Sequence, residues 1–192
     1  MRVDSADKWQ SLGAPEGRVE IVDYGPAWPR IFEREAAAIF EACRPWVTDV
    51  HHIGSTAVPG LAAKPILDVM PVVSSPVEGL GVVSRVSALG YRYRGENGIA
   101  GRFYFDRAVD GRTVAHVHML PTGHPEIRRM LVFRDYVRTH RKAARDYARL
   151  KRELASRYGD DPRAYTDAKA DFIHRAIDAA THQPASPEAE LS

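Results

Sequence analysis

The sequence predicts an α+β protein in which a small mixed β-sheet precedes a group of helices. Before residue 120, short apolar runs of strand length alternate with helical patterns. Two alternating segments flank Asp110-Gly111, a favoured two-residue turn of a β-hairpin. After Pro121 the apolar residues recur at helical spacing only, so the helices are expected to form a cap that follows the sheet.

The composition is that of a globular domain without a membrane segment. Apolar residues make up 44% of the 192 residues and charged residues 27%, which is ordinary for a folded domain of this length. No apolar run approaches the roughly 20 residues that cross a bilayer. The single cysteine, Cys43, excludes an intrachain disulfide, and the polar N-terminus lacks the apolar region of a signal peptide, so the cytoplasm is the expected location.

One domain is expected, with a less ordered segment at each end. Residues 1–17 predict a flexible N-terminal arm, and residues 18–180 predict the domain itself. Within the domain the sheet core extends to about residue 120 and the helical part covers 124–180, without a linker between them. The tail, residues 181–192, is rich in Pro, Ala, Ser and Glu and is expected to be disordered.

The elements of the sheet part are limited by prolines, glycines and turn formers. Pro45 ends the first helix and Gly90 stops the second, because proline cannot continue a helix and glycine favours its end. In chain order, the expected elements are a strand at 19–22, a helix from the turn at 23–26 to about Cys43, strands at 47–53 and 65–73, a helix at 77–89, and strands at 102–109 and 112–120.

Three helices are expected in the second part, at 124–140, 141–158 and 161–179. Asp161-Pro162 predicts the start of the third, with an N-cap followed by proline in the first turn. Residues 124–175 hold 14 basic and 8 acidic residues. This excess indicates either solvated helices with i,i+4 charge pairs, the favoured interpretation, or a lining for an anionic ligand. Aromatic stacking platforms are not evident there, which argues against nucleic-acid binding.

A candidate site lies around a Gly-Ser turn that joins two apolar strands. Gly54 permits a close backbone approach, and a turn with free N–H groups binds phosphate. Asp68 stands inside the second apolar strand, where an unpaired carboxylate is costly unless a cation or hydrogen bonds compensate it. The pair therefore predicts a phosphate and metal site. The alternative is an ordinary turn and an Asp that bonds to the backbone at a strand end.

Two histidines on the later strand at 112–120 are the next candidates. His116 and His118 are two residues apart, so they share one face of the strand. They are metal ligands in one interpretation, and imidazole suits Zn²⁺ or Mn²⁺ better than Mg²⁺. In a second interpretation they bond a phosphate or act as an acid or base. In a third they are structural residues at a sheet edge.

These segments together resemble the GrpB family, a branch of the nucleotidyltransferase superfamily. The resemblance covers about residues 19–178, and the stretch from His51 to Asp68 is its most specific part. It implies a nucleotidyltransferase-like fold, in which helices flank the small mixed sheet and a C-terminal helical cap follows. The other matching segments are Tyr24–Pro29, Arg102–Phe105, the strand with His116 and His118, Phe133–Arg138, Tyr165–Lys169 and Phe172-Ile173.

The superfamily pattern is hydrophobic-Gly-Ser, a spacer, and then Asp-hydrophobic-Asp/Glu. Ile53-Gly54-Ser55 and Asp68-Val69 match it, whereas Met70 stands where the second carboxylate is expected. The resemblance implies Asp68, His116 and His118 as the catalytic and metal-binding residues. The departure at Met70 makes a pair of protein-held metal ions doubtful.

The expected ligand is a nucleotide or another phosphorylated small molecule. The function implied is transfer of a nucleotidyl group from a nucleoside triphosphate to a small-molecule acceptor, with Mg²⁺ or Mn²⁺, or alternatively Zn²⁺. The alternative is a non-catalytic or regulatory ligand-binding protein that kept the fold and lost the full metal site. No membrane partner is expected, and no pattern specifies an oligomeric state. The expected ligand-binding residues are Gly54, Ser55, Thr56, Lys64, Arg102, Arg134 and Lys169.

Overall fold

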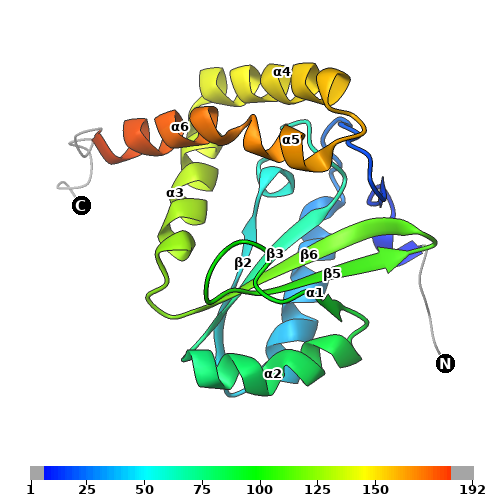
Figure 1. Ribbon diagram of the computed structural model, residues 1–192, viewed down its shortest axis with the longest axis vertical. Coiled ribbons are helices and arrows are strands. Elements are labelled where there is room, and N and C mark those ends of the chain that lie inside the picture. Colours follow the sequence, from blue (N-terminus) through cyan, green and yellow to red (C-terminus); the bar gives the residue numbers. More distant parts are fainter. Residues whose placement is uncertain (1–6, 183–192) are drawn as a thin grey trace.

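Apolar residues at alternating positions fold the first two thirds of the chain into a mixed sheet. The computed structural model describes residues 7–182 (Figure 1). Its strand order is β2-β3-β6-β5-β4, and β1 pairs with β6 beside this path. The strands are β1 (Ala14–Pro15), β2 (Val47–Ile53), β3 (Leu67–Val73), β4 (Arg92–Tyr93), β5 (Phe103–Val109) and β6 (Arg112–Pro121).

The pairing of the central strands brings the candidate residues to one place in the sheet. β3 and β6 run parallel, with Asp68 opposite His116. β2 and β3 run antiparallel, with Ile53 opposite Asp68, so the Gly-Ser turn that follows β2 begins beside this aspartate. β5 and β6 form the predicted hairpin, in which Tyr104 lies opposite His118.

Helices cover both faces of the sheet. Helices α1 (Trp28–Cys43) and α2 (Pro76–Ala88) pack on one face over apolar residues of β3 and β6, and this contact forms the main core. Helix α3 packs against Ile53, Met70 and Leu120 on the other face. The cap comprises α3 (Pro125–Thr139), α4 (Arg141–Arg157), α5 (Pro162–Asp167) and α6 (Ala170–His182), which lie together on that side in Figure 1.

The N-terminal segment differs from the flexible arm that its polar composition suggests. In residues 7–17, the part that the structure describes, Trp9 is only 3% exposed and belongs to the main core. Ala14 pairs with Thr113 of β6, and the N–H of Gly13 donates to the carbonyl of Pro65 over 2.7 Å. One buried tryptophan and a sheet edge therefore outweigh the polar composition. Residues 1–6 lie outside the described part.

Three other expectations about elements need correction. The strand expected at 19–22 is a single bridge between Val22 and Ala63. The helix expected at 161–179 is two helices, because the chain turns at Ala168 and Lys169 between α5 and α6. The expected tail begins inside α6, which extends to His182, and residues 183–192 lie outside the described part.

Between residues 7 and 182, none of the helices combines the length and the apolar character that crossing a membrane requires.

Candidate functional site

A pocket of about 590 Å³ opens between the sheet and the cap. Its floor is the sheet face that carries Asp68, and its wall is formed by α4 and by the turn between α5 and α6. Both parts of the fold therefore contribute side chains. The polar lining residues include Ser55, Lys64, Asp68, Arg102, His116, His118, Lys151 and Lys169.

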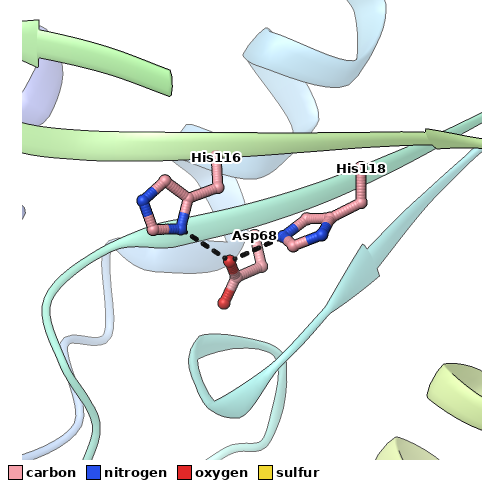
Figure 2. Close-up of side chains that lie close together, drawn as sticks. All are labelled: Asp68, His116 and His118. Carbon is pink, nitrogen blue, oxygen red and sulfur yellow. Dashed lines mark hydrogen bonds and ion pairs between the residues drawn. The ribbon is translucent and has the colours of Figure 1, made fainter. Parts of the chain in front are cut away.

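Asp68 and the two histidines form a tight cluster at the floor of the pocket. Oδ1 of Asp68 lies 3.3 Å from Nδ1 of His116 and 3.2 Å from Nε2 of His118 (Figure 2). Burial alone would raise the pKa of Asp68, but the hydrogen bonds from both rings hold that pKa well below its usual value. Asp68 is therefore a carboxylate, and its negative charge points into the pocket.

Arg102 fixes the ring of His118 from the other side. Nη1 of Arg102 lies 3.1 Å from Nδ1 of His118, and the same guanidinium donates to the carbonyls of Glu96 and Asn97. A guanidinium only donates hydrogen bonds, so Nδ1 of His118 accepts. Burial lowers the pKa of His118, and the neutral ring carries its one proton on Nε2, where it is donated to Asp68.

The Gly-Ser turn is shaped by its closeness to Asp68. Gly54 has a positive φ of 68°, and a Cβ at this position would strike the Oδ2 atom of Asp68. Ser55 opens a short 3₁₀ turn, and its hydroxyl accepts a hydrogen bond from Nζ of Lys151 over 2.9 Å. Thr56 also lines the pocket, but its hydroxyl is paired with Nε2 of His52 at 3.0 Å.

Four cationic side chains line the pocket. Lys151, only 2% exposed, also donates to the carbonyl of Ala62, and burial lowers its pKa well below the usual value. Burial lowers the pKa of Lys169 to about 8 and also lowers that of Lys64. With Arg102 they outnumber the acidic lining residues, Asp68 and the exposed Asp167. The charge balance of the pocket favours an anionic ligand.

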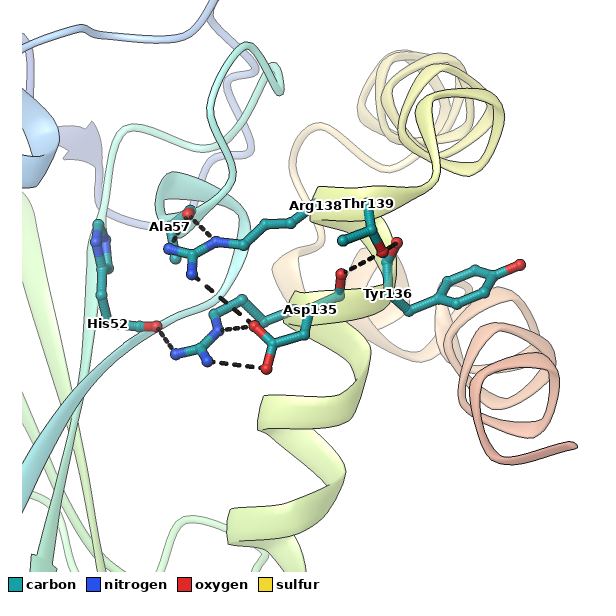
Figure 3. Close-up of polar contacts among 7 residues, drawn as sticks. His52, Ala57, Asp135, Tyr136, Arg138 and Thr139 are labelled. Carbon is teal, nitrogen blue, oxygen red and sulfur yellow. Dashed lines mark hydrogen bonds and ion pairs between the residues drawn. The ribbon is translucent and has the colours of Figure 1, made fainter. Parts of the chain in front are cut away.

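Arg134, expected to bind the ligand, lies outside this pocket. Its guanidinium donates to the carbonyl of His52 over 3.0 Å and pairs with the neighbouring Asp135. One turn later, Arg138 donates twice to the carbonyl of Ala57 (Figure 3). The i,i+4 spacing was informative, because both arginines lie on one face of α3. That face binds the backbone around the Gly-Ser turn rather than a ligand.

Met70 fills the position where the superfamily pattern has its second carboxylate. It follows Asp68 by two residues in β3 and is fully buried. Its neighbours are Ile53 and Leu120 together with apolar residues of α3. The helix has therefore covered this part of the sheet face, and the pocket ends at Asp68.

A divalent cation, the group implied by the resemblance to nucleotidyltransferases, matches the chemistry of this donor set, provided that the ring nitrogens facing Asp68 lose their protons. Asp68, His116 and His118 each offer a ligand atom, and these atoms lie within 4.8 Å of one another. A ligating imidazole keeps its proton on the nitrogen that faces away from the metal. His116, whose Nδ1 donates to Asp68 here, meets this condition once its proton moves to Nε2. His118 meets it only when Arg102 no longer donates to Nδ1.

Sequence reasoning missed Lys151, Tyr104 and the segment at 97–99, all of which line the pocket. The ring of Tyr104 contacts both histidines, with centroid distances of 5.4 Å to His116 and 5.2 Å to His118. A signal for Lys151 did exist. It follows Tyr147 by four residues, so this lysine lies on the apolar side of α4 rather than on its solvated side.

Comparisons with known proteins identify the family of the chain. The profile of a family described as "GrpB protein" matches residues 18–179. The chain is 41% identical over 84% of its length to the protein YqkA of Bacillus subtilis, and it spans about half, 47%, of that relative.

Among solved structures, the conserved protein GrpB from Enterococcus faecalis matches with a TM-score of 0.78 and 35% identity. The match covers 84% of this chain and 96% of that one. The Cid1 poly(U) polymerase bound to MgGTP matches with a TM-score of 0.47 and 17% identity, over 71% of this chain and 45% of that one. A likeness this distant carries no argument about chemistry.

Proposed function

The chain belongs to the GrpB family, and from this premise and the geometry of the pocket we propose that it binds the phosphate groups of a nucleotide together with one divalent cation. The sheet would supply the cation ligands Asp68 and His116. The cap would supply Lys151 and Lys169 for the phosphates.

The single observation that carries the proposal is the convergence of four cations on one carboxylate. Lys151 and Lys169 have lowered pKa values because they are buried near other cations. Burying like charges is costly unless an anion compensates them, so an arriving phosphate regains part of that cost. A pocket of about 590 Å³ is also in the usual size range for a small-molecule ligand rather than a single inorganic ion.

The protein would hold one divalent metal ion rather than two, because the position of a second carboxylate is occupied by the buried Met70. Asp68 is the only carboxylate that the described pocket places beside the histidines. A second divalent ion, where the chemistry needs one, would therefore arrive with the nucleotide itself.

Two uses of such a complex are distinguishable. The resemblance of Ile53-Gly54-Ser55 and Asp68 to the superfamily pattern favours nucleotidyl transfer to a small-molecule acceptor. In that reaction the oxygen or nitrogen of an acceptor bonds to the α-phosphorus and releases its proton to solvent, while the bond from the α-phosphorus to the bridging oxygen breaks and pyrophosphate leaves with that bond's electron pair. The buried Met70 favours the second use, in which the protein binds the ligand and performs no transfer.

Isothermal titration with nucleoside triphosphates and pyrophosphate, in the presence of Mn²⁺, tests binding. Lys169→Met should weaken binding at least about tenfold, because a hydrogen bond between charged groups is lost. Lys142→Met is the matched control, since this lysine of α4 is exposed to solvent and should leave affinity unchanged. Asp68→Asn should remove the dependence on Mn²⁺. A wild-type protein that binds none of these ligands would refute the proposal.

Pyrophosphate release then separates the two uses. Wild-type protein is incubated with the best-binding triphosphate, Mn²⁺ and a panel of small molecules with hydroxyl or amino groups. Release that depends on an acceptor and is lost in Asp68→Asn supports transfer. Tight binding without release under every acceptor condition supports the binding protein.

A further inference from the structure

Arg102 links two parts of the pocket that the proposed function uses separately. The residue is almost entirely buried, and its guanidinium contacts three acceptors. Two are the backbone carbonyls of Glu96 and Asn97, at 3.1 Å and 2.5 Å. The third is Nδ1 of His118, at 3.1 Å. Of the pocket's four cations, only Arg102 has a described hydrogen bond to a member of the Asp68–His116–His118 cluster.

The contact between Arg102 and His118 determines which nitrogen of the ring is available to a metal. Every polar hydrogen of a guanidinium is a donor, so Nδ1 must be bare and the ring proton must lie on Nε2. Nε2 is the nitrogen that faces Asp68, at 3.2 Å from Oδ1. A metal beside Asp68 would need a bare Nε2 and a proton on Nδ1. The same ring cannot satisfy Arg102 and a metal at Nε2 without becoming an anion.

We propose, resting on the proposed function above, that Arg102 couples metal binding to anion binding at this site. Without an anion, Arg102 holds His118 in the tautomer that cannot bind a metal, and only Asp68 and His116 are available as ligands. An anion in the pocket draws the guanidinium away from His118. The proton then moves from Nε2 to Nδ1 through solvent, with no net gain or loss, and Nε2 becomes a third ligand.

The preference of guanidinium for oxyanions supports this exchange. A phosphate or sulfate accepts two parallel charged hydrogen bonds from arginine, whereas Nδ1 accepts one and is neutral. Arg102 already lines the pocket in which the anion would bind. Because coupling between two ligands is reciprocal, the metal must raise affinity for the anion by the same factor that the anion raises affinity for the metal.

The tautomer can be read directly in the metal-free wild-type protein. Long-range proton–nitrogen correlation of the ¹⁵N-labelled histidines reports which ring nitrogen carries the proton, and His118→Gln identifies the resonances of His118. We expect a proton on Nε2 of His118 in sulfate-free buffer. A proton on Nδ1 under those conditions would overturn the proposal, and this result does not depend on whether the protein binds nucleotides.

Mn²⁺ titration followed by electron paramagnetic resonance tests the coupling, with and without sulfate as the anion probe. Sulfate should raise the affinity of the wild-type protein for Mn²⁺ about tenfold, which is the usual effect of adjusting a partner of a metal-ligating histidine. Arg102→Met removes every donor and keeps the length of the side chain. It should bind Mn²⁺ about tenfold more tightly than wild type without sulfate and should lose the response to sulfate.

Lys64→Met is the matched control, because it removes a positive charge from the same pocket and has no described contact with His118. An equal gain of Mn²⁺ affinity in Lys64→Met and Arg102→Met would mean that the loss of a positive charge explains the gain, and would overturn the proposal. If sulfate does not change the affinity of the wild-type protein for Mn²⁺, the coupling is overturned and the proposed function is not. This result needs only the wild-type protein, so it holds even if Arg102→Met fails to fold. Absence of Mn²⁺ binding in both buffers would overturn the coupling and the metal part of the proposed function together.

Discussion

The carboxylate of Asp68 has room only because residue 54 is a glycine. One oxygen, Oδ1, faces both histidines, and the other, Oδ2, lies against Gly54, where any Cβ would strike it. The glycine thus leaves room for a carboxylate between the Gly-Ser turn and β6. Its positive φ of 68° is a second reason why an L-amino acid with a side chain does not suit this position.

Met70→Asp tests whether a second metal position can be restored in one step. The new carboxylate would be buried among apolar residues without a partner, so we expect the free energy of unfolding to fall by about 4 kcal/mol. Met70→Leu, the control, should cost less than about 1.5 kcal/mol. Urea denaturation measures both. A stable Met70→Asp protein that binds two Mn²⁺ ions without nucleotide would contradict the structural role given to Met70.

His52 should make the fold sensitive to mild acid. The ring is 7% exposed, stacks on Phe32 at 4.5 Å and is paired with Thr56. Burial lowers the pKa of His52 from 6.5 to about 4. Between pH 4 and pH 6.5 this histidine is therefore protonated in the unfolded chain but neutral in the folded protein. The free energy of unfolding should therefore be at its full value above pH 6.5 and should fall by about 3 kcal/mol as the pH decreases towards 4.

Urea denaturation between pH 4 and pH 7 measures this effect. The wild-type free energy of unfolding should decrease with falling pH, and His52→Gln should flatten that decrease. His51→Gln alters the neighbouring residue of the same strand and serves as the control, with the slope of wild type. Identical slopes for wild type and His52→Gln would show that His52 is not the responsible group.

At the residue scale, the sequence was most informative where spacing fixes direction. The two-residue period of strands placed His116 and His118 on one face, and an aspartate in an apolar strand indicated a compensated charge. Lys151 and Arg134 show the limit of such reasoning. Both belong to charged helices, and only tertiary packing decides which cation points into the pocket and which one holds the backbone.

Among the elements, the turn between α5 and α6 matters most for the site. Asp161 caps α5 with two hydrogen bonds to backbone N–H groups, and Tyr165 is buried below it. The helical pattern is then interrupted by a turn at Ala168 and Lys169, after which α6 begins (Figure 1). From the continuous helix that the sequence suggested, one could not predict that Lys169 lines the pocket.

Lys169 should give anion binding a dependence on pH. Burial and the nearby Lys64 lower its pKa to about 8, and the charge of Asp68 opposes this shift. Its ammonium also lies 4.2 Å from the ring of Tyr165 and acts on buried Lys151. The charged form predominates below pH 8, so affinity for pyrophosphate should fall as the pH rises from 7 to 9.5, by about fivefold or more.

Isothermal titration in this range provides the measurement, with buffers of matched ionic strength. Lys169→Arg keeps a charge throughout the range because the pKa of arginine lies above 12. It should therefore lose most of the pH dependence, whereas Lys142→Arg on the exposed side of α4 should behave as wild type. An undiminished pH dependence in Lys169→Arg would assign the titration to another lysine.

Element prediction succeeded where local chemistry decides the outcome. The hairpin at Asp110-Gly111 and the buried strand that carries Asp68 follow from turn preference and apolar runs, and the structure confirms both. The strand expected at 19–22 and the break at Lys169 depend on distant partners. Val22 forms a single β-bridge, with Ala63, and no stop signal interrupts the helical pattern from 161 to 179.

Across the whole molecule, the site is divided between two parts of the chain. The sheet carries the carboxylate and both histidines, and the cap contributes Lys151 and Lys169. Arg134 and Arg138 of α3 join the parts through backbone carbonyls next to the Gly-Ser turn. The packing of α3 on the sheet therefore helps to fix the distance between the Asp68–His116–His118 cluster and the lysines of the cap.

A ligand that contacts both parts should hold the cap against the sheet. Hydrogen exchange of the wild-type protein, with and without Mn²⁺ and pyrophosphate, should show slower exchange of amides in α4 and α5 when both are present, because a ligand bound to both parts opposes local opening of the cap. Helix α2 lies on the opposite face and provides an internal control with unchanged exchange. Protection confined to β3 and β6 would indicate that the cap takes no part in binding.

The residues of the site are also synthesised in a fixed order, because they are spread along the chain. Asp68, His116 and His118 all precede residue 122, whereas Lys151 and Lys169 come from the last quarter of the chain. On the ribosome, a nascent polypeptide that has emerged as far as β6 contains the carboxylate and both histidines of the cluster, but of the four basic residues of the pocket only Lys64 and Arg102. The two cap lysines of the proposed anion site are thus synthesised after the strands that carry its carboxylate and histidines.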